Sequence, residues 1–288
     1  MMFDDRKEAL RAKINELVKI SSIPSVLKKI MEITGSGNSS VTDLEAVIEH
    51  DQALALRIVG ISNAVFYGFP RKISSISQAI LVLGFEMVKG LAISMVVFKG
   101  ISGDRRNDVA AIWQHSFEVA LTSTLLAQKT GLISKDTAFL AGLLHDIGRP
   151  IIFQVHGKNY LEVSAPDSAG LIVLEEESFG AAHPEAGAWF ADKCKLPEDC
   201  VAAIRYHHDP ETYRLHMEAA ERHLSCLVPM VYLADLIVSD GNSLTSKYTV
   251  ISPDHAFFLK SLNLKGEALK EISETVDGLK DQIRAYYN

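Results

Sequence analysis

Apolar residues that recur at helical spacing restrict the fold of this chain more than any other feature. They return every three or four positions in residues 44–48 and 76–83, the period expected for one face of a helix. No stretch alternates apolar and polar residues for long enough to suggest a sheet. With 48% hydrophobic residues, the chain can also bury a sizeable core. We therefore predict an all-α protein.

Two capping boxes predict where helices begin. Thr42 and Glu45 have the spacing of such a box. The Thr side chain can accept a hydrogen bond from a backbone N–H in the first turn, while the Glu side chain reaches back toward the start of the helix. Ser75 and Gln78 form a second pair of this kind. The apolar stretch 79–98 follows the second box and carries a Glu and a Lys near its middle. We expect buried helices there rather than a membrane span.

Charge and composition narrow the classes of function. Lys and Arg number 29 against 36 Asp and Glu, so the net charge of −7 disfavours a general nucleic-acid surface. The N-terminus is charged and lacks the apolar segment of a signal peptide. Three cysteines without a CxxC motif suit reduced thiols better than a disulfide framework. We expect a cytoplasmic protein that binds neither nucleic acid nor membrane.

Some imidazoles and carboxylates fall in strongly apolar helices. His115 shares its predicted helix face with apolar residues, and residues 139–144 are apolar on every side and lead straight into His145 and Asp146. Asp235 is the only charge between residues 227 and 238. A buried ionised carboxylate is costly unless it is paired or binds a cation. Taken singly, His115 could be a satisfied core histidine, and Asp235 could cap a neighbouring helix or pair with an Arg.

Three more histidines stand at helix ends. His183 precedes a proline at the start of an amphipathic stretch, and His207 and His208 end another apolar-periodic helix. Each has a simpler interpretation, as a helix-start residue or as one packed and one solvated imidazole. Together with the preceding residues they favour a metal site, because a single cation would satisfy two buried carboxylates at once. Such donors suit Fe, Mn, Zn or Ni better than Mg or Ca, and a bridging Asp146 would let two metals share the site.

At these residues the sequence resembles the HD superfamily, and over about residues 18–240 it resembles the HDOD (HD-related output domain) family. The HD signature stands in AFLAGLLHDIGRPII, and a second block reads HPEAGAWFADKCKLPEDCVAAIRYHHDP. Upstream, residues 43–68 and 74–92 resemble the N-terminal HDOD signature. Two positions depart from the family pattern: Gln52 replaces the usual Pro, and Cys194 stands where Trp is common. The blocks agree in order and spacing, so the resemblance is specific.

The resemblance implies an all-α, two-lobed helical HDOD fold with an HD-domain-like C-terminal lobe. The polar stretch 103–108 is the expected junction. Residues 1–104 would then form the N-terminal helical lobe, and residues 105–240 the HD-like lobe with the metal site. Residues 241–288 follow a second polar break and are expected to form helices that pack back onto the domain.

The resemblance also implies a set of metal ligands. The related HD-GYP phosphodiesterases hydrolyse cyclic di-GMP at a two- or three-metal centre, and every ligand position of their pattern is filled here. The implied ligands are His115, His145, Asp146, His183, His207, His208 and Asp235. Asp146 would bridge one ion held by His115, His145 and Asp235 and a second held by His183, His207 and His208.

Three departures from the HD-GYP pattern limit the inference. No GYP motif follows His208, so the segment implied for substrate recognition is missing. Arg149 replaces the lysine of the HDxGK motif, and Ala111 stands where three-metal relatives carry Glu. The resemblance therefore implies one or two divalent transition-metal ions, with Fe or Mn favoured and Zn or Ni as alternatives.

Three functions stay open on the sequence. The first is a bacterial signal-transduction output or adaptor module with a signalling protein as partner, favoured by the missing GYP motif and the large N-terminal lobe. The second is a dinuclear HD-type phosphohydrolase or phosphodiesterase acting on a nucleotide or cyclic dinucleotide. Its catalytic residues would be Asp146, which bridges the ions, and Arg149, which holds the phosphate. The third is a redox-sensing switch built on a two-iron centre.

Overall fold

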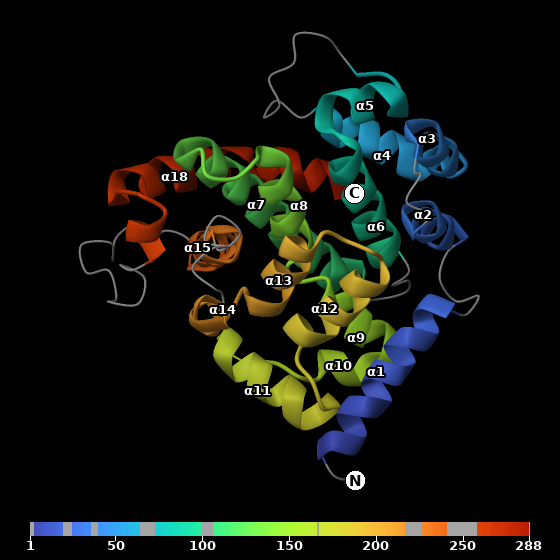
Figure 1. Ribbon diagram of the computed structural model, residues 1–288, viewed down its shortest axis with the longest axis vertical. Coiled ribbons are helices and arrows are strands. Elements are labelled where there is room, and N and C mark those ends of the chain that lie inside the picture. Colours follow the sequence, from blue (N-terminus) through green and yellow to red (C-terminus); the bar gives the residue numbers. More distant parts are fainter. Residues whose placement is uncertain are drawn as a thin grey trace.

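The computed structural model contains only helices among the residues it describes (Figure 1). These residues are 3–19, 25–35, 40–63, 73–99, 106–165, 167–216, 226–240 and 258–287. No strand occurs within those ranges, and the predicted all-α class is confirmed. The helices span Phe3–Lys19 (α1), Ser25–Gly35 (α2), Val41–Glu49 (α3), Gln52–Ser62 (α4), Ile76–Leu83 (α5), Phe85–Lys99 (α6), Arg106–Thr130 (α7), Lys135–Leu144 (α8), Gly148–His156 (α9), Lys158–Leu161 (α10), Ser168–Phe179 (α11), His183–Lys193 (α12), Glu198–Tyr206 (α13), Pro210–His216 (α14), Leu227–Asp240 (α15) and Gly266–Tyr287 (α18).

Serine side chains mark the beginning of three of these helices, α3, α5 and α8. Ser75 accepts a hydrogen bond from the backbone N–H of Gln78, as the sequence predicted. The other predicted start was wrong by two residues, because Ser40 and not Thr42 caps α3. The Ser40 hydroxyl accepts from the N–H of Asp43, whose carboxylate accepts in return from the N–H of Ser40 at 3.2 Å. An Asp at the third helical position therefore completes the reciprocal box that we assigned to a Glu.

Helices α2 to α6 form the first lobe, in which α6 is the central element (Figure 1). The apolar stretch 79–98 forms α5 and α6, and residues 87–98 are all buried, so the prediction of buried helices is confirmed. Among the described residues, no single helix is both long and apolar enough to cross a membrane, although α5 and residues 85–98 of α6, bent by 119°, pass that test together.

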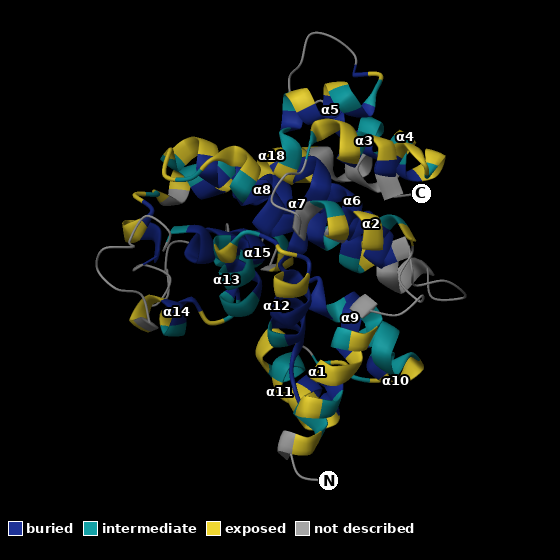
Figure 2. Ribbon diagram, turned by 45° about the vertical axis from the view of Figure 1, so that its right-hand side comes forward, coloured by how far each residue is buried: buried dark blue, intermediate teal, exposed yellow. Residues whose placement is uncertain are grey.

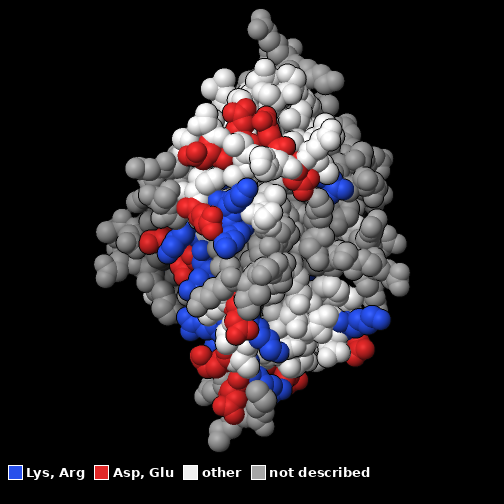
Figure 3. All heavy atoms as spheres, turned by 90° about the vertical axis from the view of Figure 1, so that its right-hand side faces the viewer, with Lys and Arg blue, Asp and Glu red and all other residues white. Residues whose placement is uncertain are grey.

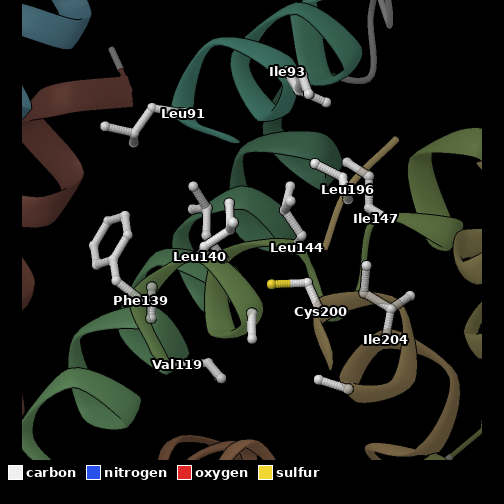
Figure 4. Close-up of a cluster of buried hydrophobic side chains, with 14 of the residues drawn as sticks. Leu91, Ile93, Val119, Phe139, Leu140, Leu144, Ile147, Leu196, Cys200 and Ile204 are labelled. Atoms are coloured by element: carbon white, nitrogen blue, oxygen red, sulfur yellow. The ribbon is translucent and has the colours of Figure 1, made fainter. Parts of the chain in front are cut away.

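Helix α8 lies at the centre of the second lobe, and residues 138–144 are buried on every side. Helices α6, α7, α13 and α15 surround it. Figure 4 shows Leu140 and Leu144 in a cluster with Leu91 of α6 and Cys200 of α13. Figure 2 shows the same division across the molecule, with α7 and α8 largely buried and α3, α4 and α5 exposed on their outer faces. His145 and Asp146 follow α8 directly, and both are therefore buried in the interior.

Two glycines allow α9 and α12 to approach until their backbones touch. A Cβ on Gly148 would lie 1.9 Å from the carbonyl oxygen of His183 and 2.8 Å from the nitrogen of Gly187. A Cβ on Gly187 would lie 2.9 Å from the nitrogen of Gly148. Only glycine fits at such a contact. The approach brings the turn that carries Asp146 against the start of α12, which carries His183.

The two terminal helices pack on the HD-like lobe. Helix α1 lies along α12, α11 and α9, with Lys7 paired to Glu185 at 2.8 Å and the Arg11 guanidinium 5.5 Å from the Trp189 ring centre (Figure 1). Helix α18 packs on α7 and buries Leu269. Residues 103–105 of the expected junction and residues 241–257 lie outside the described residues, and residues 106–108 form the start of α7. The boundaries at 104 and 240 stay predictions.

The charged side chains form no broad basic area on the face shown in Figure 3. Among the described residues there, Lys and Arg are interspersed with Asp and Glu, and one part of the face carries acidic side chains alone. This distribution agrees with the negative net charge.

Candidate metal centre

The structure brings together seven side chains from distant parts of the sequence. They come from helices α7, α12 and α15 and from the turns that follow α8 and α13. They form two groups, and within each group the donor atoms lie within 4.8 Å of one another. One group is Asp146, His183, His207 and His208, and the other is His115, His145 and Asp235. All seven residues that the sequence singled out lie here, and their role as ligands stays a prediction.

The first group is three imidazoles around one carboxylate. The Nε2 atoms of His183 and His207 lie 3.2 and 3.6 Å from Oδ1 of Asp146. The Nε2 atom of His208 lies 3.2 Å from that of His183. Three ring nitrogens and a carboxylate oxygen therefore face a common point, the arrangement that a small divalent cation requires.

The second group lies on the other side of Asp146. The Nε2 atom of His115 is 3.0 Å from Oδ1 of Asp235, and that of His145 is 4.0 Å from the same oxygen. The Ser239 hydroxyl donates to this oxygen at 3.0 Å. Asp235 has no Arg partner among the described residues, so the simpler interpretation as an Arg-paired aspartate does not hold.

Asp146 connects the two groups through its two oxygens. Oδ1 faces His183 and His207, whereas Oδ2 lies 3.8 Å from Nε2 of His145 in the second group. Oδ2 also accepts a hydrogen bond from Nη1 of Arg149 at 3.2 Å. A carboxylate with one oxygen on each side has the geometry of a bridging ligand between two ions.

The orientation of two buried histidines supports a cation rather than a closed hydrogen-bond network. Nδ1 of His145 donates to the carbonyl oxygen of Gly142 at 2.7 Å, and Nδ1 of His207 donates to that of Ile204 at 2.8 Å. With the proton on Nδ1, each Nε2 presents a lone pair. Both Nε2 atoms are buried and have no hydrogen-bond partner. An unpaired buried acceptor costs about 1–3 kcal/mol, and a divalent ion bound to each group would remove that cost at both histidines.

Glu175 is a functional residue that the sequence analysis missed. Its side chain is fully buried, and one oxygen accepts hydrogen bonds from Nδ1 and from the backbone N–H of His183, at 2.6 and 2.8 Å. The other oxygen accepts from the Tyr160 hydroxyl at 2.6 Å. Metal-bound histidines commonly donate their second N–H to a carboxylate, which fixes the ring and raises its basicity. Glu175 holds His183 with Nε2 toward Asp146.

Two imidazoles of the centre are held neutral by their surroundings. Burial lowers the pKa of His145 to about 4, although Asp146 and Asp235 oppose it. Burial, together with the neighbouring imidazoles of His207 and His183, lowers the pKa of His208 to about 2. Both rings therefore keep a free lone pair at neutral pH, which is the form that binds a metal.

The other charged groups of the centre stabilise one another. Burial lowers the pKa of His183, but Glu175 and Asp146 outweigh it and raise that pKa to about 9. Burial opposes ionisation of Asp146 as well, yet His145, Arg149 and His183 hold its pKa well below the ordinary value. The pKa of Asp235 is lowered in the same way by His115 and His145. Without a metal, the proton on His183 occupies a place that a cation would take.

Comparison with known proteins assigns the family. Residues 20–210, more than half of the chain, match the HDOD domain. The chain belongs to the HDOD family. This HDOD chain is 25% identical over 208 residues to an uncharacterised protein of Treponema pallidum, and it spans 39% of that protein's length.

Two solved structures have the same fold as this HDOD chain. A Shewanella amazonensis SB2B protein called "Putative phosphohydrolase" is 22% identical with a TM-score of 0.66, and the match covers 95% of this chain and 96% of the other. A Marinobacter aquaeolei VT8 protein called "Putative signal transduction protein" is 21% identical with a TM-score of 0.63, covering 99% and 65% respectively. The two-lobed HDOD fold implied by the sequence is confirmed.

Five of the seven side chains of the HDOD centre line a cavity, and His145 and His207 lie behind them. This cavity has a volume of about 150 Å³ and is lined by His115, Asp146, His183, His208 and Asp235, together with Arg149, Ser168, Leu171 and Ser239. The centre is therefore buried within the domain and still open to a small ligand. Its donor set could hold a divalent metal ion.

Proposed function

We propose that this HDOD domain is an output module of bacterial signalling that carries two divalent metal ions. One observation carries the proposal: two groups of His and Asp donors share Asp146 and leave two buried ring nitrogens without partners. His115, His145 and Asp235 would hold one ion, and the three histidines of the first group the other. The output would pass to a signalling protein as partner, in a cytoplasmic setting.

The donor chemistry favours Fe or Mn, with Zn or Ni as alternatives, because five imidazoles and two carboxylates are intermediate donors. Neither group contains a thiolate, and Cys194 and Cys200 belong to the apolar core. Burial raises the pKa of both thiols, so they stay protonated. Mixed nitrogen and oxygen donors around a shared carboxylate suit a pair of redox-capable ions.

The test is the metal content of untagged protein purified without chelator, measured by plasma mass spectrometry. We expect about two transition-metal ions per chain in the wild type. Asp146→Ala should lose one or both ions, while Asp43→Ala, which removes an exposed carboxylate far from the centre, should keep both. A metal-free protein, even after anaerobic reconstitution with Fe or Mn, would refute the proposal.

A second candidate is a metal-dependent phosphohydrolase, and the cavity over the centre favours it. Arg149 lies on the wall of this cavity beside Asp146, where its guanidinium could bind a phosphoryl oxygen. A bound metal pair would supply Lewis acidity and an activated water. Asp146 would keep the two ions at a fixed spacing, and Glu175 would keep His183 in place.

The enzyme candidate is tested by turnover of nucleotides and cyclic dinucleotides by metal-loaded protein. Turnover of roughly 1 per second or faster would support catalysis. The activity must be lost in Asp146→Ala, and activity that survives this substitution would belong to another site or to a contaminant. Metal-loaded protein without turnover would leave the signalling module as the function.

A further inference from the structure

A second cleft adjoins the metal centre, and metal binding by the seven proposed residues gives this cleft no role. Its volume is about 410 Å³, and it shares His115, Arg149 and Leu171 with the smaller cavity over the centre. The two openings are therefore continuous along α7, α9 and α11. A volume of this size falls within the roughly 300–1,000 Å³ typical of small-molecule sites.

The end of the cleft nearest the metal centre is suited to an anion. Arg149 donates to Asp146, but its Nε atom is buried and has no hydrogen-bond partner. The Tyr160 hydroxyl lies beside the same guanidinium and donates to Glu175. Two divalent ions would carry more positive charge than Asp146 and Asp235 neutralise, and Arg149 would add to it. An anion with two or three oxygens could then contact both the guanidinium and the ions.

The far end of the cleft is apolar. Ile112, Leu161 and Val163 line it, and all three are only half-buried, so their side chains form an accessible wall. Ser164 contributes a hydroxyl at this end. A wall of this kind favours a flat, weakly polar group over a sugar that carries many hydroxyls.

The width of the cleft depends on one small residue of α7. Ala111 is exposed on the cleft wall, one helical turn before His115. Any larger side chain at this position would point into the space between His115 and the apolar wall. The cleft is therefore open because residue 111 is an alanine.

We propose that this cleft binds a nucleoside monophosphate, with the phosphate at Arg149 and the metal pair and the base against the apolar wall. The proposal rests on the proposed metal centre and names the ligand class of that site. The single apolar wall accommodates one base, which distinguishes this ligand from a cyclic dinucleotide. The polar groups, Arg149 and Tyr160, stand between the wall and the metals, where the phosphate of a mononucleotide would lie.

The test is isothermal titration calorimetry of metal-loaded protein with the 5′-monophosphates of adenosine, guanosine, cytidine and uridine. Inorganic phosphate, ribose 5-phosphate and cyclic di-GMP serve as comparison probes. The decisive variant is Ala111→Trp, which fills the cleft without replacing a metal donor, and Ala111→Leu is a smaller version of it. The matched control is Gln128→Trp, at an exposed position on the same helix.

At least one mononucleotide should bind more than tenfold tighter than ribose 5-phosphate. Ala111→Trp should weaken that binding at least tenfold, while metal content and inorganic phosphate binding stay as in the wild type. Gln128→Trp should change neither. Equal mononucleotide affinity in Ala111→Trp and wild type, or a preference for cyclic di-GMP, would overturn the proposal.

Metal content and mononucleotide binding together distinguish failure of the proposed mononucleotide site from failure of the proposed metal centre. If the protein holds two ions and binds inorganic phosphate but no mononucleotide, the proposed mononucleotide site is refuted and the proposed metal centre is supported. Protein that holds no metal but binds a mononucleotide in an Ala111-dependent manner would refute the centre and support the cleft. Unchanged metal content and thermal melting in Ala111→Trp would show that the variant is folded.

Discussion

Glu175 offers the sharpest test of how the fold tunes the metal centre. Replacing it by Gln keeps the shape of the side chain but removes its charge. The carboxylate accepts three hydrogen bonds, two from His183 and one from Tyr160. An amide has only one accepting oxygen, so at least one of these donors loses its partner. Loss of such an outer partner typically weakens metal binding about 10–100-fold, or roughly 1.4–2.8 kcal/mol.

The charge of Glu175 also sets the competition between metal and proton at His183. Burial lowers the pKa of His183, whereas Glu175 and Asp146 raise it to about 9. In the wild type the metal must therefore displace a proton at pH 7, and affinity should rise about 25-fold between pH 7 and pH 8.5 as that competition fades. In Glu175→Gln the pKa of His183 falls toward its ordinary value, so this rise should largely disappear.

The assay is Mn²⁺ affinity by competition with a fluorescent chelator, anaerobically at pH 7 and pH 8.5. The ratio of wild-type to Glu175→Gln affinity should grow about 20-fold over this interval, because the wild type gains far more from proton loss than the variant. Glu176→Gln, a neighbouring exposed glutamate, should behave as the wild type. A ratio that stays constant with pH would refute the role assigned to Glu175.

Three further outcomes follow from the geometry. Asp146→Asn should reduce the metal content to at most one ion per chain, measured by plasma mass spectrometry, because the bridging carboxylate is lost. Loading the wild type at pH 7 should release about one proton from His183, measured by calorimetry in buffers of different ionisation enthalpy. Gly148→Ala should destabilise the fold by about 1–3 kcal/mol in urea unfolding, because its Cβ would meet the His183 carbonyl oxygen at 1.9 Å. Gly278 is an exposed residue of α18, and a Cβ added there would have no neighbour within 4 Å. Gly278→Ala should therefore stabilise the fold by up to about 1 kcal/mol. Equal effects of the two substitutions would refute the close-contact argument.

Much of the centre could be predicted because charges in apolar helices are conspicuous. His145 and Asp146 follow a helix that is apolar on every side, and Asp235 is the only charge in α15 before the terminal Asp240. Burying these groups without compensation is costly, so their positions alone indicate a bound cation or partner. The helical period likewise predicted the all-α class, because it is a local property of the chain.

Glu175 could not be found in this way. It stands in a run of three glutamates, residues 175–177, of which the other two are exposed. Local sequence gives no reason to bury the first of them. It is buried because the start of α12 and Tyr160 place three hydrogen-bond donors around its carboxylate. Its spacing of eight residues before His183 was the only signal available, and that spacing has no meaning until the turn at Gly180 reverses the chain.

The sequence by itself determined that the chain is helical and that seven His and Asp side chains were candidates for one buried site, because both follow from local apolar patterns. Only the tertiary structure decided how these donors are arranged. The contact between Gly148 and the start of α12 places Asp146 against His183, and the packing of α15 on α7 places Asp235 against His115. The cleft beside Arg149 exists for the same reason, since its walls come from four helices, α7, α9, α10 and α11. Distances between helices depend on packing across the whole lobe, and no local stretch of sequence contains that information.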